Sequence, residues 1–161
     1  MQRPHVMRVS ACLALLLLVF LSGCIHTISK QSLARADRSL KFSELQKDPD
    51  AHRGKLIIVG GVVAGVRQVK EGAELEVVEY PLDNEELPDT AAWSEGSFLV
   101  VLPSSADMTQ FKPGAIVTMA GEVTGKAVRS LKNMEYTYPV LVAKEIYITV
   151  PPPGGYPPGY R

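Results

Sequence analysis

The chain has few of the residues on which catalytic and metal sites are usually built. It contains two cysteines, Cys12 and Cys24, and three histidines in 161 residues. No two Cys or His residues stand at metal-ligand spacing, and no GxSxG, HExxH, GxGxxG or GK[ST] motif occurs. We expect His26 and His52 to be ordinary surface residues. The sequence therefore predicts no enzyme, no metal site and no bound cofactor.

Basic residues are missing from the middle of the chain. No Lys or Arg occurs between Glu71 and Phe111, a stretch that carries ten acidic residues. Residues 42–161 hold 11 basic against 16 acidic groups, whereas a nucleic-acid partner needs a basic surface. The acidic run at 83–86 also lacks the DxDxDG pattern of a Ca²⁺ loop. We expect a solvated acidic face and no nucleic-acid partner.

The longest apolar run, residues 11–21, is too short to serve as a membrane span. Eleven helical residues cover roughly 16 Å, about half the hydrocarbon thickness of a bilayer. Arg3 and Arg8 precede the run and small residues follow it, which is the order of a secretory signal peptide. Met1 and Met7 both fit as the start, since Arg8 supplies a positive charge in either case. Residues 1–23 are therefore expected to be removed from an exported protein.

The end of this signal resembles a bacterial lipobox, formed by Leu21, Ser22, Gly23 and Cys24. The resemblance implies cleavage between Gly23 and Cys24, an S-diacylglycerol on the Cys24 thiol and an acyl chain on its new amine. At about 0.8 kcal/mol per buried CH₂, two or three chains anchor a protein permanently. Cys12 leaves with the signal, so the mature chain has no disulfide and no catalytic thiol. Ile25 in place of Asp after the cysteine favours the outer membrane.

Composition divides the mature chain into three parts. Residues 24–41 carry four basic residues against Asp37 and are expected to form the lipidated cysteine and a flexible tether. Residues 42–150 have the length of one folded domain. Residues 151–161, PPPGGYPPGYR, contain too much Pro and Gly for helix or sheet, so we expect a disordered tail.

The sequence of the domain predicts an all-β fold that follows a short N-terminal helix near residues 42–48. No segment beyond residue 50 keeps a 3.6-residue apolar period. Runs rich in Val, Ile and Tyr, bounded by Gly, Pro and Asp, predict strands. These predicted strands cover residues 55–66, 74–80, 97–102, 115–124 and 136–150. A small curled or closed antiparallel barrel of five to six strands, similar to an OB-fold, is the expected architecture.

Two local patterns sharpen that expectation. The segments GKLIIVGGVVAG (54–65) and GAIVTMAGEVTG (114–125) repeat at an offset of 60, with glycines inside both strands. Interior glycines mark the bulges and bends that let a sheet curl. In the 74–80 strand, Leu75 and Val77 should point inward and Glu74 and Glu76 outward. Val78 and Glu79 interrupt this alternation, which predicts a bulge before Pro81.

Beyond the lipobox, the chain resembles the Slp family of outer-membrane lipoproteins, named for a starvation-inducible lipoprotein. Two positions depart from the family pattern: Ser97 stands where an Arg is common, and Ile146-Tyr147 where a Trp is common. The resemblance implies outer-membrane attachment and a role in envelope stability under starvation or acid stress, and it supplies no catalytic residues. It is carried by Phe42, Leu45, Asp48-Pro49, Gly54-Lys55, Gly60-Gly61, LEVVEYPL (75–82), Pro88, SEGSF (94–98), Val117-Thr118, Gly121-Glu122-Val123, Gly125 and YTYPV (136–140).

Two functions fit the sequence. The first is a non-enzymatic, lipid-anchored protein of the outer membrane that faces the periplasm, with membrane lipid and other envelope proteins as partners. The second is a periplasmic binding module, in which one barrel face binds an oligosaccharide, a cell-wall fragment or an envelope protein. Tyr80, Trp93, Tyr136 and Tyr138 are the candidate ligand face for that second function.

Overall fold

Five β-strands form most of the described part of the chain, which covers residues 27–70, 72–131 and 134–149 of this computed structural model. Two short helices and two 3-10 turns precede or connect the strands. In chain order the elements are α2 (Lys30–Arg35), α3 (Phe42–Lys47), η1 (Pro49–His52), β1 (Leu56–Val69), β2 (Gly72–Glu79), β3 (Ser97–Pro103), η2 (Met108–Gln110), β4 (Ile116–Leu131) and β5 (Met134–Thr149). The expected all-β class and the helix near residues 42–48 are confirmed.

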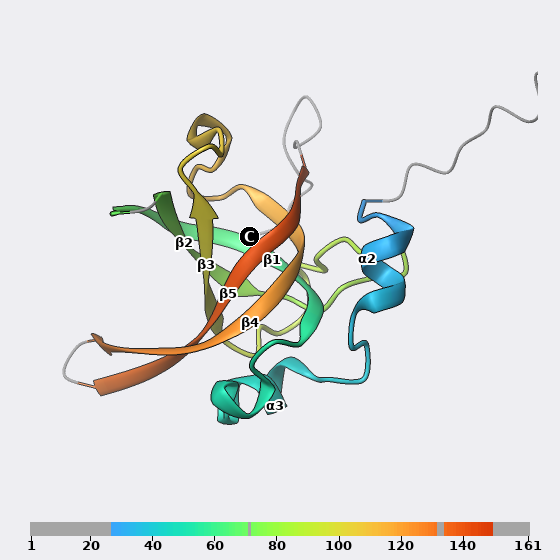
Figure 1. Cartoon of the computed structure of the whole chain (residues 1–161), viewed down its shortest axis with the longest axis horizontal. Coiled ribbons are helices and arrows are strands. Elements are labelled where there is room, and N and C mark those ends of the chain that lie inside the picture. The colour runs from blue at the N-terminus through green and yellow to red at the C-terminus, as the bar shows by residue number, and fades with distance from the viewer. Residues whose placement is uncertain (1–26, 71, 132–133, 150–161) are drawn as a thin grey trace, which may run out of the picture.

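The strands close into a barrel in the order β1-β2-β3-β5-β4, as Figure 1 shows. Four neighbouring pairs are antiparallel, whereas β3 and β5 pair in parallel through Leu99–Val101 and Val140–Val142. The expectation of an antiparallel barrel is wrong for this one pair of strands. Strand directions cannot alternate all the way around a closed ring with an odd number of strands, so one of the five neighbouring pairs must be parallel.

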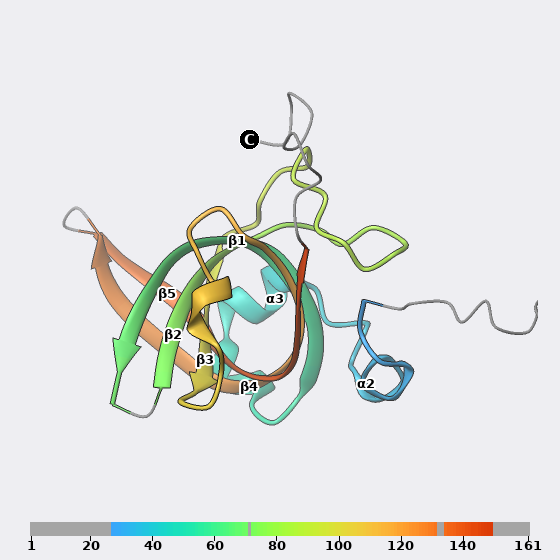
Figure 2. The same cartoon turned by 90° about the horizontal axis from the view of Figure 1, so that it is seen from above.

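Apolar side chains from every strand fill the barrel, and α3 closes one end. Phe42 and Leu45 of α3 are buried, and the Phe42 ring lies 5.8 Å from the ring of Phe98 on β3. Figure 2 shows the strands as a ring with α3 across its opening. Phe111, which follows η2, is also part of the core. The other core residues are Ile57, Val59, Val63, Leu75, Val77, Val100, Leu102, Val117, Met119, Val123 and Leu141.

The two glycine-containing segments of the internal repeat are neighbouring strands. β1 and β4 pair so that Gly61 lies opposite Val117 and Gly121 lies opposite Ile57. The β1–β2 ladder shifts register between Val63 and Gly65, and the β4–β5 ladder shifts between Ala120 and Gly121, where the extra residue is on β5, and between Val123 and Gly125. Irregularities of the kind that bend a sheet therefore occur beside Gly65, Gly121 and Gly125, whereas the ladders are regular at Gly60 and Gly61.

Two hairpins extend further than the sequence predicts. β1 continues to Val69, and β4 continues to Leu131 before β5 begins at Met134. In Figure 1 the β4–β5 hairpin projects well beyond the barrel. Within the described residues, positions 134–139 of β5 pair with β4 alone. Pro139 lies in this part of the strand, which fits the rule that proline occupies an edge.

The segment from residue 27 onward is folded, which corrects the expectation of a flexible tether up to residue 41. Ile28 has no exposed surface, and Ser29 after it is the N-cap of α2. The backbone N–H of Asp37 donates to the carbonyl of Leu56 on β1 over 2.8 Å. An isolated six-residue helix is not stable in water, so these contacts with the barrel hold α2 in place. The signal peptide, Cys24 and the tail at 151–161 lie outside the described residues.

Candidate functional site

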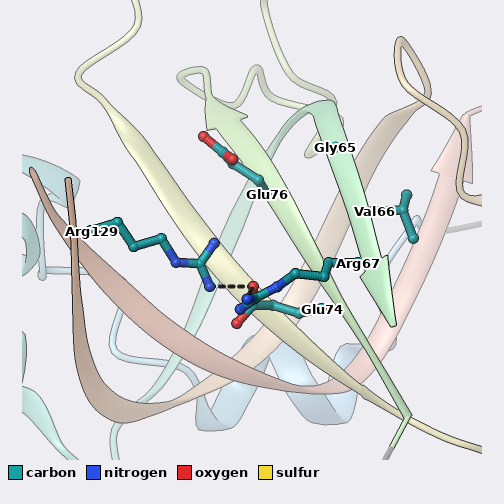
Figure 3. A pocket seen from close by; sticks show the side chains of 6 residues that line it. All are labelled: Gly65, Val66, Arg67, Glu74, Glu76 and Arg129. Carbon is teal, nitrogen blue, oxygen red and sulfur yellow. Dashed lines mark hydrogen bonds and ion pairs between the residues drawn. The ribbon is translucent and has the colours of Figure 1, made fainter. Parts of the chain in front are cut away.

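Charged side chains gather on the outer surface of β2, where Glu74 and Glu76 point away from the core. Leu75 and Val77 between them are fully buried, as their alternation predicts. An open pocket of about 230 Å³ lies over the two glutamates. Figure 3 shows its wall, which is formed by Gly65, Val66 and Arg67 of β1, Glu74 and Glu76 of β2, and Arg129 of β4.

Glu74 is shared by two arginines in this pocket. Arg67 Nη2 donates to Glu74 Oε1 over 2.9 Å, and Arg129 Nη2 donates to the same oxygen. Partial burial of the carboxyl opposes its ionisation, but the hydrogen bonds from Arg129 and Arg67 outweigh burial and lower the pKa of Glu74. The carboxylate therefore stays charged and links the β4–β5 hairpin to β2.

Replacing Glu74 with Gln should destabilise the chain by about 1–2 kcal/mol, because the half-buried Arg129 loses its counter-charge. The matched control is Glu122→Gln, since Glu122 pairs with Lys144 at 3.0 Å on an exposed surface. That control should cost about 0.5 kcal/mol or less. Urea unfolding at neutral pH measures both, and equal losses would contradict a structural role for the Glu74 pair.

Tyr136 and Tyr138 of β5 lie beside this pocket, with ring centroids 4.6 Å apart. The Tyr138 hydroxyl donates to Glu76 Oε1 over 3.1 Å, and its ring lies 5.8 Å from the Arg129 guanidinium. Burial, together with the bond to Glu76, raises the pKa of Tyr138 to about 12. The Tyr136 hydroxyl accepts from Gln46 Nε2 at 2.6 Å and from the Ser97 N–H at 3.2 Å. Both hydroxyls are thus engaged within the protein.

Of the four aromatic residues predicted as a ligand face, the structure brings these two tyrosines together. Tyr138 is almost fully buried and Tyr80 is half-buried, whereas Trp93 is 93% exposed. No ring contact joins Tyr80 or Trp93 to the tyrosine pair among residues 27–70, 72–131 and 134–149. The binding-module hypothesis therefore stays a prediction without a single exposed aromatic surface to support it.

Glu79, the last residue of β2, is a buried carboxyl that the sequence patterns did not predict. The ladders of β2 with β1 and β3 show no bulge at Val78, so the expected bulge is wrong and Glu79 continues the inward face of Leu75 and Val77. Only 6% of Glu79 is exposed. Its Oε2 accepts from the Glu95 N–H at 3.1 Å. Burial, aided by the nearby charge of Glu95, raises the pKa of Glu79 to about 7 although the Glu95 N–H favours the charged form.

The described residues contain neither a metal-binding cluster nor a membrane-spanning helix. No group of three or more His, Cys, Asp or Glu side chains there is placed to bind a metal ion. No helix in the same residues has the length and hydropathy needed to cross a bilayer.

Comparison with known protein families identifies the family to which the chain belongs. The model for the outer membrane lipoprotein Slp family matches residues 21–153. The chain belongs to this family. The matched range begins at Leu21 and includes all five strands, which confirms the predicted resemblance. Membership of the Slp family supports a lipoprotein role in the cell envelope and location at the outer membrane. Neither the search of curated proteins nor that of solved structures gives a match.

Proposed function

We propose that the chain is a non-enzymatic lipoprotein that is held at the outer membrane by lipid on Cys24 and stabilises the envelope under starvation or acid stress. Cleavage between Gly23 and Cys24 exposes the amine that is acylated, and the domain faces the periplasm. The observation that carries the proposal is the Slp family match, whose range starts at the first residue of the lipobox.

The chemistry of the pocket on β2 supports a structural role over a catalytic one. Glu74 is neutralised by two arginines, and Glu76 accepts a hydrogen bond from the Tyr138 hydroxyl. A general base must be free to take a proton at the working pH, and a lowered pKa makes Glu74 a weak base. These groups instead hold the β4–β5 hairpin against the outer surface of β2.

Replacing Cys24 with Ala tests the anchor. The thiol is the only atom in the mature chain that can receive the diacylglycerol, so the variant should lose membrane attachment or remain uncleaved. Membrane fractionation measures the first outcome, and the mass of the protein measures cleavage and lipid together. Cys12→Ala is the matched control and should behave as wild type. Recovery of a processed Cys24→Ala protein in the membrane fraction would contradict the proposal.

A further inference from the structure

Residues 27–32, which follow the proposed anchor closely in sequence, are bonded to the barrel and its loops. The Thr27 hydroxyl donates to the carbonyl of Glu85 over 3.1 Å, and Ile28 is fully buried. Ser29 donates to both oxygens of Glu145 on β5, through its N–H at 2.7 Å and its hydroxyl at 2.9 Å. The Ser32 hydroxyl adds a further bond to Glu145 at 2.8 Å. Residues 27–32 are therefore held in a fixed position against the barrel.

The far end of α2 is fastened as well. The Ala36 N–H donates to the Ser32 carbonyl at 3.0 Å, and the Asp37 N–H donates to Leu56 at 2.8 Å. Asp37 also pairs with Lys55 at 2.9 Å. With contacts at both ends, α2 presents one constant face to solvent.

That face is basic. Lys30, Gln31, Ala34 and Arg35 are exposed, whereas Ser32 and Leu33 on the opposite side are half-buried. The helix has no acidic residue. The one acidic residue of segment 27–41, Asp37, is already paired with Lys55.

The basic residues on this face of α2 have few acidic partners. Among the described residues, Lys30, Arg35 and Lys41 form no ion pair within 4.0 Å. Arg38 lies 4.0 Å from Glu86 and is the one basic residue of the segment with an acidic neighbour. Segment 27–41 therefore has a net charge of +3, with four basic residues against Asp37, and the Glu145 carboxylate lies at the N-terminal end of α2, where Ser29 and Ser32 bond to it.

Resting on the proposed lipidation of Cys24, we propose that the exposed face of α2 lies on the membrane and binds the phosphate groups of anionic lipids. Three residue steps from Cys24 to Thr27 span at most about 11 Å, so α2 cannot move far from the bilayer. Lys and Arg at this distance are attracted by an anionic surface. α2 lies at one end of the molecule and the β1–β2 and β4–β5 hairpins at the other (Figures 1 and 2). The hairpins therefore point away from the membrane.

The test measures energy transfer from a fluorophore on the lipidated protein to a headgroup-labelled acceptor lipid in phosphatidylcholine vesicles containing phosphatidylglycerol. The mature chain has no free thiol once Cys24 is lipidated, so Ala34→Cys on α2 and Gln68→Cys near the β1–β2 hairpin each give a single label. We expect transfer from position 34 to exceed transfer from position 68 by roughly twofold or more. Equal transfer, or more from position 68, would overturn the proposal.

Charge reversal separates lipid contact from simple tethering. Lys30→Glu with Arg35→Glu should lower transfer from position 34 by roughly twofold in the anionic vesicles and leave it unchanged in pure phosphatidylcholine. The control Lys70→Glu reverses an exposed charge on the far hairpin and should change nothing. Molar salt on the wild type, which cuts the screening length to about 3 Å, repeats the test without mutation. Insensitivity to both treatments would refute the contact, whereas a protein that fails to float with vesicles would refute the lipid anchor instead.

Discussion

Gly61→Ala is expected to destabilise the barrel by about 3 kcal/mol or more. Gly61 lies between β2 and β4, opposite Glu79 and Val117. A Cβ at this position would overlap the carbonyl oxygen of Val78. This oxygen belongs to the backbone and cannot rotate away, so β1 and β2 must separate and lose ladder hydrogen bonds. The loss is a large part of the roughly 5–15 kcal/mol that stabilises a domain.

The same strand supplies the control. Gly65 has no positive φ, and a Cβ there would meet no atom within 4 Å. Gly65→Ala should leave stability unchanged or raise it by up to about 1 kcal/mol, because Ala restricts the unfolded chain. Urea unfolding followed by far-UV circular dichroism compares the two variants. Similar midpoints for both would show that the close approach at Gly61 does not constrain the barrel.

The contrast between these glycines shows how far the sequence predicts the fold. The repeat of interior glycines predicts bent strands, and the alternation of Leu75 and Val77 predicts an inward face. The repeat does not distinguish Gly61 from Gly65, because which glycine meets another strand depends on the register of β1 with β2. Register between strands is set by packing across the barrel, which is not a local property of the chain.

The missed elements have a similar cause. Residues 125–135, GKAVRSLKNME, contain too many polar residues for a strand prediction. β4 nevertheless continues to Leu131 and β5 begins at Met134, and the contact of Arg129 with Glu74 on β2 holds this extension in place. Segment 30–35 is a helix because Ser29 and Ser32 bond to Glu145, which lies 113 residues or more away. Long-range contacts of this kind override weak local preferences.

The candidate sites also differ in whether they depend on a local sequence pattern or on contacts between distant residues. Cys24 is predicted from sequence because a lipobox is a continuous pattern, read by residues next to one another. The Glu74 pocket needs Arg67, seven residues before Glu74, and Arg129, 55 residues after it. Glu79 could have been found from the sequence: it falls on the same face as Leu75 and Val77 if the alternation is continued without a bulge.

Glu79→Gln is expected to stabilise the protein above pH 7 by about 3 kcal/mol and to remove much of the pH dependence of its stability. Below the ordinary pKa of 4.5 the Glu79 carboxyl is protonated in both states and makes no difference. Between 4.5 and about 7 the unfolded chain releases this proton while the folded chain keeps it, so the free energy of unfolding falls as pH rises. Above about pH 7 the folded chain has also released the proton, and the free energy of unfolding falls no further. The difference between 4.5 and about 7, at 1.36 kcal/mol per unit of pKa, gives the loss of about 3 kcal/mol.

Gln at position 79 resembles the protonated carboxyl and can still accept the Glu95 N–H. Urea midpoints for wild type and variant between pH 4 and 8 should therefore meet at the acid end and diverge toward neutrality. Carboxyls with lowered pKa, such as Asp50 and Glu145, lose stabilising charge on acidification, but they are present in both proteins and cancel in the difference. Glu135→Gln, on the exposed part of β5, should run parallel to wild type. Parallel curves for Glu79→Gln as well would mean that water reaches the Glu79 carboxylate in the folded barrel, because only solvation could return its pKa to the ordinary value.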